Sequence, residues 1–223
     1  MSDYILSVNQ IADFLKSTDS KKIRIIKQQK YPNIIRVGWY QMPRARFKKV
    51  IELNGDLKPL EDAANLLNSR ILEKPRQVLN RTVSLEAMQR FSKIKLPYLL
   101  KFPIEIIKKV ESKTIEINGV QILVSPDVVF KINIDGEHYY GAVKIHISKN
   151  NIFDYKQSSC ISSILFQYLK ENFETENCRV NPELCLAIDV FGEKITSSPV
   201  DINDSMAQIS LICEEVKYFW SAA

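Results

Sequence analysis

Two charged residues in the second half of the chain lie within apolar segments. Asp127 follows Ser125-Pro126 and precedes an apolar run, and Lys144 ends the segment Gly141-Ala142-Val143-Lys144. An ionised side chain placed among Val and Ile is destabilising unless it is paired or binds a metal. A carboxylate and an ammonium on neighbouring strands could hold Mg²⁺ and stabilise charge on a phosphate under attack. The pair therefore predicts metal-assisted chemistry on a phosphate.

The elements expected to position this pair are short strands joined by tight turns. Residues 114–124 alternate apolar and polar around Asn118-Gly119, the strongest local signal for a hairpin. Strands are expected over 126–134 and 139–148, with a turn at Asp135-Gly136 between them. The remaining pattern predicts a helix over 152–172, a strand over 184–190 and a closing helix over 201–219.

The first hundred residues are expected to be mostly helical. The apolar spacing predicts helices over 7–15 with Ser7 as N-cap, 21–27, 60–71, 84–91 and a short one over 104–109. An aromatic-bearing loop is expected over 33–42, between two prolines. The fold class is thus α/β (α+β): a mixed central sheet flanked by helices. We expect a helical, basic N-terminal lobe over 1–103 and an α/β core over 104–223.

Charge is distributed unevenly along the chain. The net charge is +5, but residues 16–50 hold 11 Lys or Arg against one acid, and residues 183–223 hold seven acids against two bases. A basic block with interleaved aromatic residues could contact a phosphate backbone, or it could be a solvated helix face. The candidate nucleic-acid contacts are Lys21, Lys22, Arg24, Lys27, Arg44, Arg46, Lys48 and Lys49.

Residues 118–144 resemble the core of the restriction-endonuclease-like superfamily, the PD-(D/E)xK nucleases, and within it the RecB-type branch. The matching segments are Gly119, Ile122-Leu123-Val124, Pro126-Asp127, Asp135-Gly136 and Val143-Lys144. The resemblance covers about residues 105–190 and extends to Gln157 in the following helix. The Tyr that usually follows that Gln is replaced by Ile161. The resemblance implies a Mg²⁺-dependent DNA nuclease.

In this family Asp127 would be the principal metal ligand and Lys144 would polarise the attacking water. The family pattern also has an acid two residues before the Lys, where this chain has Ala142. Strand alternation places residues 142, 144 and 146 on one face, so one carboxylate is missing there. Either another acid replaces it or the site is inactive. The candidates are Glu105, Glu137, Asp154 and the favoured Glu111, which is expected on a helix before the first core strand.

Several of these residues have plain structural alternatives. Asp127 could lie in an exposed turn, and Lys144 could extend its ammonium group to water from the margin of the sheet. His146 could be a metal ligand or a base, but a hydrogen-bonded strand histidine is the favoured interpretation. Asp189 could be a second polar group within the sheet, but an outward-facing strand position is the favoured interpretation.

Three functions are consistent with these features. The first is a Mg²⁺-dependent DNA nuclease, with Asp127, Lys144, Glu111 and Gln157 at the site. The second is an inactive nuclease fold that binds nucleic acid, DNA rather than RNA, or protein. The third is a homo-oligomer in which basic and acidic halves of different copies meet.

Composition limits the class of protein further. No apolar run is long enough to cross a membrane, and the basic region of a signal peptide is missing at the start. A cytoplasmic protein is the expectation. The four cysteines do not have the spacing of a zinc site, so we expect buried, reduced thiols.

Overall fold

The computed structural model describes residues 4–31 and 39–223. Within these ranges a short first strand is followed by a run of helices and then by a run of strands, and the strands form a three-stranded and a five-stranded sheet. The α-helices are α1 (Val8–Phe14), α2 (Asp19–Lys30), α3 (Gln41–Glu52), α4 (Lys58–Ser69), α5 (Pro75–Ser92), α6 (Tyr155–Asn172) and α7 (Asn203–Ala222), with a short 3₁₀ helix at Tyr98–Lys101.

The larger sheet has the strand order β2-β5-β6-β7-β8. Its strands are β2 (Ile104–Ile106), β5 (Val128–Ile134), β6 (Glu137–His146), β7 (Arg179–Asp189) and β8 (Lys194–Ser197). All neighbours are antiparallel except β6 and β7, which are parallel and joined by α6. This arrangement confirms the expected α+β class with a mixed sheet flanked by helices.

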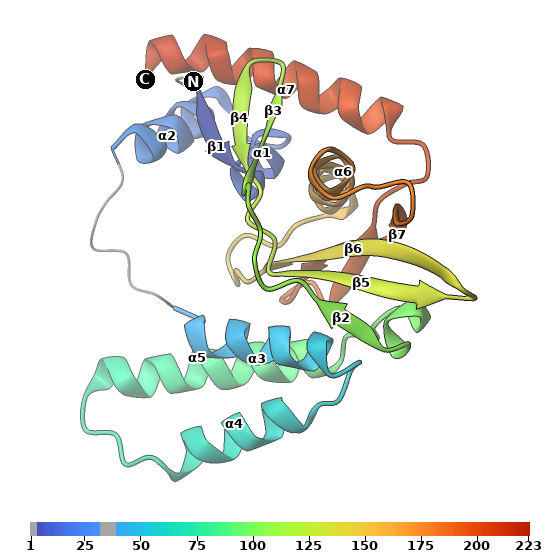
Figure 1. The fold of residues 1–223 in the computed structure, drawn as a ribbon. Coiled ribbons are helices and arrows are strands. Elements are labelled where there is room, and N and C mark those ends of the chain that lie inside the picture. Colours follow the sequence, from blue (N-terminus) through green and yellow to red (C-terminus); the bar gives the residue numbers. More distant parts are fainter. Residues whose placement is uncertain (1–3, 32–38) are drawn as a thin grey trace.

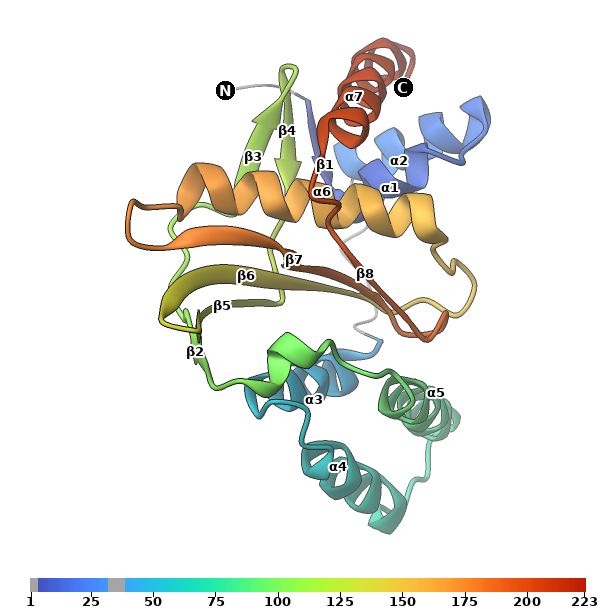
Figure 2. The same ribbon diagram turned by 90° about the vertical axis from the view of Figure 1, so that its right-hand side faces the viewer.

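Helices cover both faces of this sheet (Figures 1 and 2). Helix α6 lies across one face, and the bundle of α3, α4 and α5 lies on the other. Alternation along β5 divides its side chains between the two cores. Val129 packs in the α6-side core, whereas Val128 and Phe130 pack in the core on the bundle side. Strands buried on both faces explain why these segments are almost continuously apolar.

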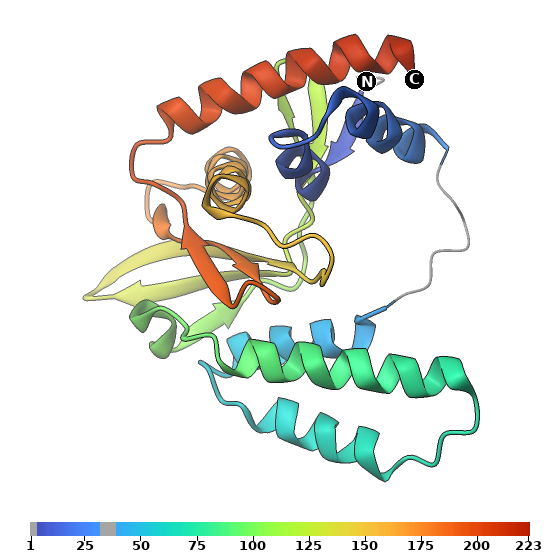
Figure 3. The same cartoon turned by 180° about the vertical axis from the view of Figure 1, so that it is seen from behind.

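The smaller sheet has the order β1-β4-β3 and lies beside α1, α2 and α7 (Figures 1 and 3). Strands β3 (Thr114–Ile117) and β4 (Val120–Leu123) form the predicted hairpin. Its turn residues Asn118 and Gly119 have φ of 49° and 73°, which suits the Asn-Gly pair. Strand β1 (Ile5–Ser7), which the sequence pattern did not predict, runs parallel to β4.

The helix expected over 104–109 is wrong, because residues 104–106 form strand β2. Ile104 and Ile106 alternate with Glu105, and the three residues pair with β5. β-branched residues on alternate positions fit a pleated surface better than a helix. The sheet edge thus determines the structure of a segment that is too short for a clear periodic signal.

Other boundaries differ less. Ser7 caps α1 in a capping box with Gln10, as predicted. Helix α5 starts at Pro75, earlier than expected, and α3 starts at Gln41, inside the predicted loop. Residues 33–38 of that loop lie outside the described residues. Pro43 is compatible with α3 because a proline in the first turn removes no helical hydrogen bond.

The first hundred residues do not lie together in space. Helices α1 and α2 pack with α6 and α7, whereas α3, α4 and α5 pack with each other beneath the larger sheet. The division after residue 103 stays a prediction about the domains. The candidate contacts in the basic block are separated in the same way, since Lys21, Lys22, Arg24 and Lys27 lie on α2 and Arg44, Arg46, Lys48 and Lys49 on α3.

Candidate functional site

Asp127 lies immediately before β5 and forms an ion pair with Arg44 of α3. One guanidinium nitrogen of Arg44, Nη1, lies 2.8 Å from Oδ1 and 3.0 Å from Oδ2 of Asp127. The same nitrogen donates to the carbonyl of Ile145 at 2.9 Å, and the amide of Ile145 donates to Asp127 Oδ2 at 2.8 Å. The side chain of Asp127 is only 7% exposed, so the alternative of an exposed turn is wrong.

Lys144 lies close to this ion pair but hydrogen-bonds to the backbone. Its Nζ donates to the carbonyl of Val124 at 2.8 Å and to that of Ser125 at 2.6 Å. Ser125 has a left-handed φ of 40°, which is unfavourable for a residue with a Cβ. The ammonium of Lys144 therefore stabilises the turn that leads into Asp127, and it does not extend to water.

The environment of Lys144 lowers the pKa of its ammonium group. Burial is the largest cause that lowers its pKa, the carboxylate of Asp127 raises it, and the cations Arg44 and Lys48 lower it, with a net pKa of about 8. Three basic side chains thus interact around a single carboxylate. Positive charge is in excess there, and this favours an additional anion over an additional cation.

A cavity of about 510 Å³ opens beside Asp127. It lies between α3, the connection from β2 to β3, and the turn before β5. Four lysines line it, together with Glu52, Ser125 and an apolar wall that includes Pro126 and Val129. The lysines are Lys48, Lys108, Lys109 and Lys113.

The donor set at Asp127 does not fit Mg²⁺. Both carboxylate oxygens accept hydrogen bonds from Arg44, and one also accepts from the amide of Ile145. Mg²⁺ requires near-octahedral oxygen ligands and repels a guanidinium placed against the same carboxylate. Among residues 4–31 and 39–223, no group of three or more His, Cys, Asp or Glu side chains is placed to hold a metal ion.

The acids considered as replacements for the missing carboxylate have other positions. Glu111 lies on an exposed bend and not on a helix, outside the residues that line the cavity. Glu105 faces Lys131 across the strand pair, and Glu137 accepts from the Tyr139 hydroxyl at the far hairpin. Asp154 caps α6 and pairs with Lys16. Glu52 of α3, which the sequence analysis did not consider, is the acid that shares the cavity with Asp127.

Gln157 and Asp189 are structural residues. Gln157 completes the capping box of α6 with Asp154 and donates to the carbonyl of Ala12 at 3.2 Å. Asp189 is 1% exposed, so its expected outward position is wrong. Its carboxylate accepts from the amides of Phe153 and Gly192, at 2.7 and 2.6 Å, and so joins two loops.

His146 has the structural role that the sequence analysis favoured. Its ring stacks on Phe153, and its Nε2 lies 2.7 Å from the carbonyl of Asn151. Burial lowers the pKa of His146 more than Asn151 and Asp189 raise it. A neutral ring that donates to a carbonyl is a stable strand histidine, and its Nε2 proton is not available for catalysis.

The predicted nucleic-acid contacts differ in their surroundings. Lys22 pairs with Glu215 of α7 at 2.7 Å, and Lys21 lies 3.6 Å from Asp13, whereas Arg24 and Lys27 are exposed on α2. On α3, Arg44 holds Asp127 and Lys48 lines the cavity, while Arg46 and Lys49 line a separate hollow next to α4. Of the eight candidates, Arg44 and Lys48 belong to the Asp127 site.

The lysines between β2 and β3 were not among the predicted site residues. Lys108, Lys109 and Lys113 follow one another closely in the sequence, but they lie outside the long basic block. Their spacing was a usable signal of local positive charge.

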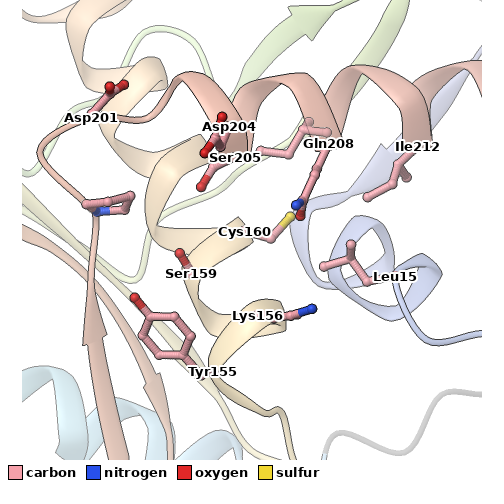
Figure 4. A pocket seen from close by; sticks show the side chains of 12 residues that line it. Leu15, Tyr155, Lys156, Ser159, Cys160, Asp201, Asp204, Ser205, Gln208 and Ile212 are labelled. Carbon is pink, nitrogen blue, oxygen red and sulfur yellow. The ribbon is translucent and has the colours of Figure 1, made fainter.

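A second, smaller cavity lies between α6 and α7 (Figure 4). Its volume is about 260 Å³, and its polar lining includes Asp201 just before α7, Asp204 in the first turn of α7, and Lys156 and Ser159 from α6. The two carboxylates make it a poor site for an anion. Cys160 also lines it, and burial raises the pKa of that thiol to about 12, so the sulfur is not a ready nucleophile.

All four cysteines are buried and unpaired, in agreement with the sequence analysis. Within the part of the chain that the structure describes, no helix combines the length and apolarity needed to cross a membrane. No protein-family model and no curated protein matches this chain.

Proposed function

We propose that this protein binds the phosphate backbone of DNA at the Asp127 site without metal-dependent cleavage. The proposal adopts the alternative of a nuclease-like fold that acts as a binding module. One observation supports it above the others: Arg44 pairs with Asp127, and Lys144 beside them interacts with both and with Lys48, so positive charge exceeds negative charge and the site attracts an anion.

The ion pair explains why charge at this site favours binding over metal catalysis. Arg44 supplies a permanent positive charge at the carboxylate where the family resemblance implies Mg²⁺. The exposed lysines Lys108, Lys109 and Lys113 then provide phosphate contacts around the cavity. Lysines that neutralise phosphates release counterions, which makes such binding sensitive to salt.

The competing function is the Mg²⁺-dependent nuclease that the sequence resemblance implies. It requires Arg44 to leave Asp127 and a second carboxylate to approach. Glu52 is the acid in the same cavity, but its carboxylate pairs with Lys49 at 3.1 Å. The two functions predict opposite effects of metal and can be separated in one set of assays.

The test measures binding and cleavage with the same DNA. We expect fluorescence anisotropy to show binding at about 50 mM salt that weakens steeply as salt rises and is unchanged by EDTA. Linear, circular and single-stranded DNA should remain intact after incubation with Mg²⁺. Replacing Lys108 and Lys109 by Ala should weaken binding by about tenfold or more, because two phosphate contacts are lost.

A matched variant controls for the change in net charge. Lys170 and Lys194 are exposed and lie outside the cavity, so Lys170→Ala combined with Lys194→Ala removes the same charge elsewhere. This control should bind DNA like the wild type. Mg²⁺-dependent cleavage that Asp127→Ala abolishes would contradict the proposal and establish the nuclease.

A further inference from the structure

The lysines of the Asp127 site line one partly open cavity and come from different elements. Lys48 comes from α3, and Lys108, Lys109 and Lys113 come from the connection between β2 and β3. An extended backbone-binding stripe would follow one helix or one sheet edge. Four cations around one cavity can contact a backbone at the rim, and they are also suited to a compact, strongly charged group inside the cavity.

The size of the cavity limits what can enter it. Its volume of about 510 Å³ lies in the range of small-molecule sites, which is roughly 300–1,000 Å³. A DNA duplex cannot enter such a space, whereas one nucleotide can. The internal part of a duplex would therefore contact the rim and leave the cavity unfilled.

The lining of the cavity is suited to a nucleotide in two respects. Ile106, Ile107, Val110 and Val129 supply an apolar wall against which a base or sugar can pack. The lysines lie in the same lining and can contact a phosphate. Ligand sites commonly combine an apolar wall with a few charged groups that orient the ligand.

Charge distinguishes a terminal phosphate from an internal one. A phosphate monoester carries about −1.5 to −2 at neutral pH, and an internal diester carries about −1, so the monoester gains more from clustered lysines. Only two carboxylates, Asp127 and Glu52, lie in the described lining, and Arg44 pairs with Asp127. The excess of positive charge matches a monoester.

We propose that the cavity receives the terminal nucleotide of a DNA strand and binds its phosphate monoester through Lys48, Lys108, Lys109 and Lys113. This inference rests on the proposed DNA binding and specifies its substrate as a phosphorylated strand end. A free nucleoside monophosphate has the same chemistry and is separated from the strand end by the test.

The test compares short single-stranded oligonucleotides that differ only at one end. They carry a 5′-phosphate, a 3′-phosphate or hydroxyls, with a dye at the opposite end, and a circular strand serves as a competitor without ends. We expect one of the two phosphorylated strands to bind about tenfold tighter than the hydroxyl strand. The circular strand and thymidine monophosphate should both compete poorly with it.

The two double lysine variants described above test whether the lysines of the cavity cause the preference for a phosphorylated end. Lys108→Ala with Lys109→Ala should remove the preference for a phosphorylated end, while Lys170→Ala with Lys194→Ala should retain it. Unchanged thermal unfolding of both pairs, whose side chains are exposed, shows that folding is preserved.

The outcomes separate the two proposals. Salt-sensitive DNA binding with equal affinity for phosphate and hydroxyl ends overturns the strand-end site and leaves the proposed function intact. Thymidine monophosphate that binds as tightly as the phosphorylated strand overturns the strand end in favour of a free nucleotide. No binding of any DNA overturns both.

Discussion

Lys144 combines two roles that a surface lysine does not have. Its ammonium donates to the carbonyls of Val124 and Ser125, and it adds positive charge near Asp127, which lines the cavity. Burial lowers its pKa to about 8, close to neutrality, while exposed lysines stay charged to about pH 10. The titration of this one side chain therefore makes the charge of the Asp127 site depend on pH.

The first prediction concerns stability and pH at Lys144. Its pKa of about 8 in the folded protein is below the ordinary lysine value of 10.5, so the unfolded chain binds more protons between these pH values. Unfolding becomes less favourable wherever the unfolded state binds more protons, so this residue should increase stability as pH rises above about 8. From about pH 7 to pH 9.5 the gain should be about 2 kcal/mol.

Urea unfolding at both pH values measures this gain. Lys144→Met removes the titrating group and keeps most of its length, so the variant should lack the Lys144 part of the change. An identical pH response in the wild type and the variant would show that Lys144 stays protonated throughout.

At the scale of elements, β6 requires a residue without a side chain at Gly141. A Cβ built there would lie 2.4 Å from Cζ of Phe130 and 2.8 Å from Cβ of Leu184. The register between β6 and β7 also shifts at this point, between Tyr140 and Ala142. The approach of three strands at Gly141 thus determines how β6 continues toward Lys144.

The second prediction follows from this contact. Gly141→Ala should lower the free energy of unfolding by about 1–3 kcal/mol, because overpacking displaces neighbouring side chains. Phe130→Leu should relieve part of the clash. The double variant should therefore be more stable than the sum of the two single effects implies, and a double-mutant cycle from urea unfolding measures the difference. If the effects of the two single variants on the free energy of unfolding simply add, the strain caused by Gly141→Ala does not arise from its contact with Phe130.

Over the whole molecule, opposite charges from the two ends of the chain meet within one copy. Lys22 of α2 pairs with Glu215 of α7, and Lys30 donates to the carbonyl of Trp220 at 2.6 Å. The basic segment on α2 and the acidic segment on α7 therefore contact each other within one copy, and a second copy is not needed to pair them. Assembly into a homo-oligomer stays a prediction, and charge pairing is no longer its main support.

The third prediction follows from the positions of the basic residues, some of which lie on α2 and others beside the cavity. Arg24→Ala with Lys27→Ala changes exposed cations on α2, away from the cavity, and should leave DNA affinity and its salt dependence unchanged. Lys48→Ala with Lys113→Ala should reduce the slope of log affinity against log salt by about 2, since each lost phosphate contact reduces it by about 1. Anisotropy titrations over a range of salt concentrations measure both slopes.

An equal loss of DNA affinity in the two double variants would mean that bound DNA extends from the α3 side to α2. That result would contradict a binding site confined to the Asp127 cavity. The α2 pair therefore serves as an internal control of equal charge within the basic block itself.

Local signals in the sequence were sufficient for several elements. Asn118-Gly119 and Asp135-Gly136 specify tight turns because these residues tolerate positive φ, and the structure has both hairpins. Ser7 predicts the start of α1 by capping free amides. Alternation placed Lys144 on the same strand face as Ala142. The turns, the helix cap and the strand alternation each involve residues only a few positions apart, so the local sequence is sufficient to predict them.

The site depends on contacts between distant segments. Arg44 and Asp127 are 83 positions apart, and their ion pair forms only because α3 packs beneath the larger sheet. Residues 104–106 become a strand because β5 offers them an edge, and this places the following lysines beside Asp127. Asp127 and Lys144 were recognisable as unusual residues from their apolar surroundings. Their partners are an arginine and backbone carbonyls, and such partners follow from packing in three dimensions, which no local pattern specifies.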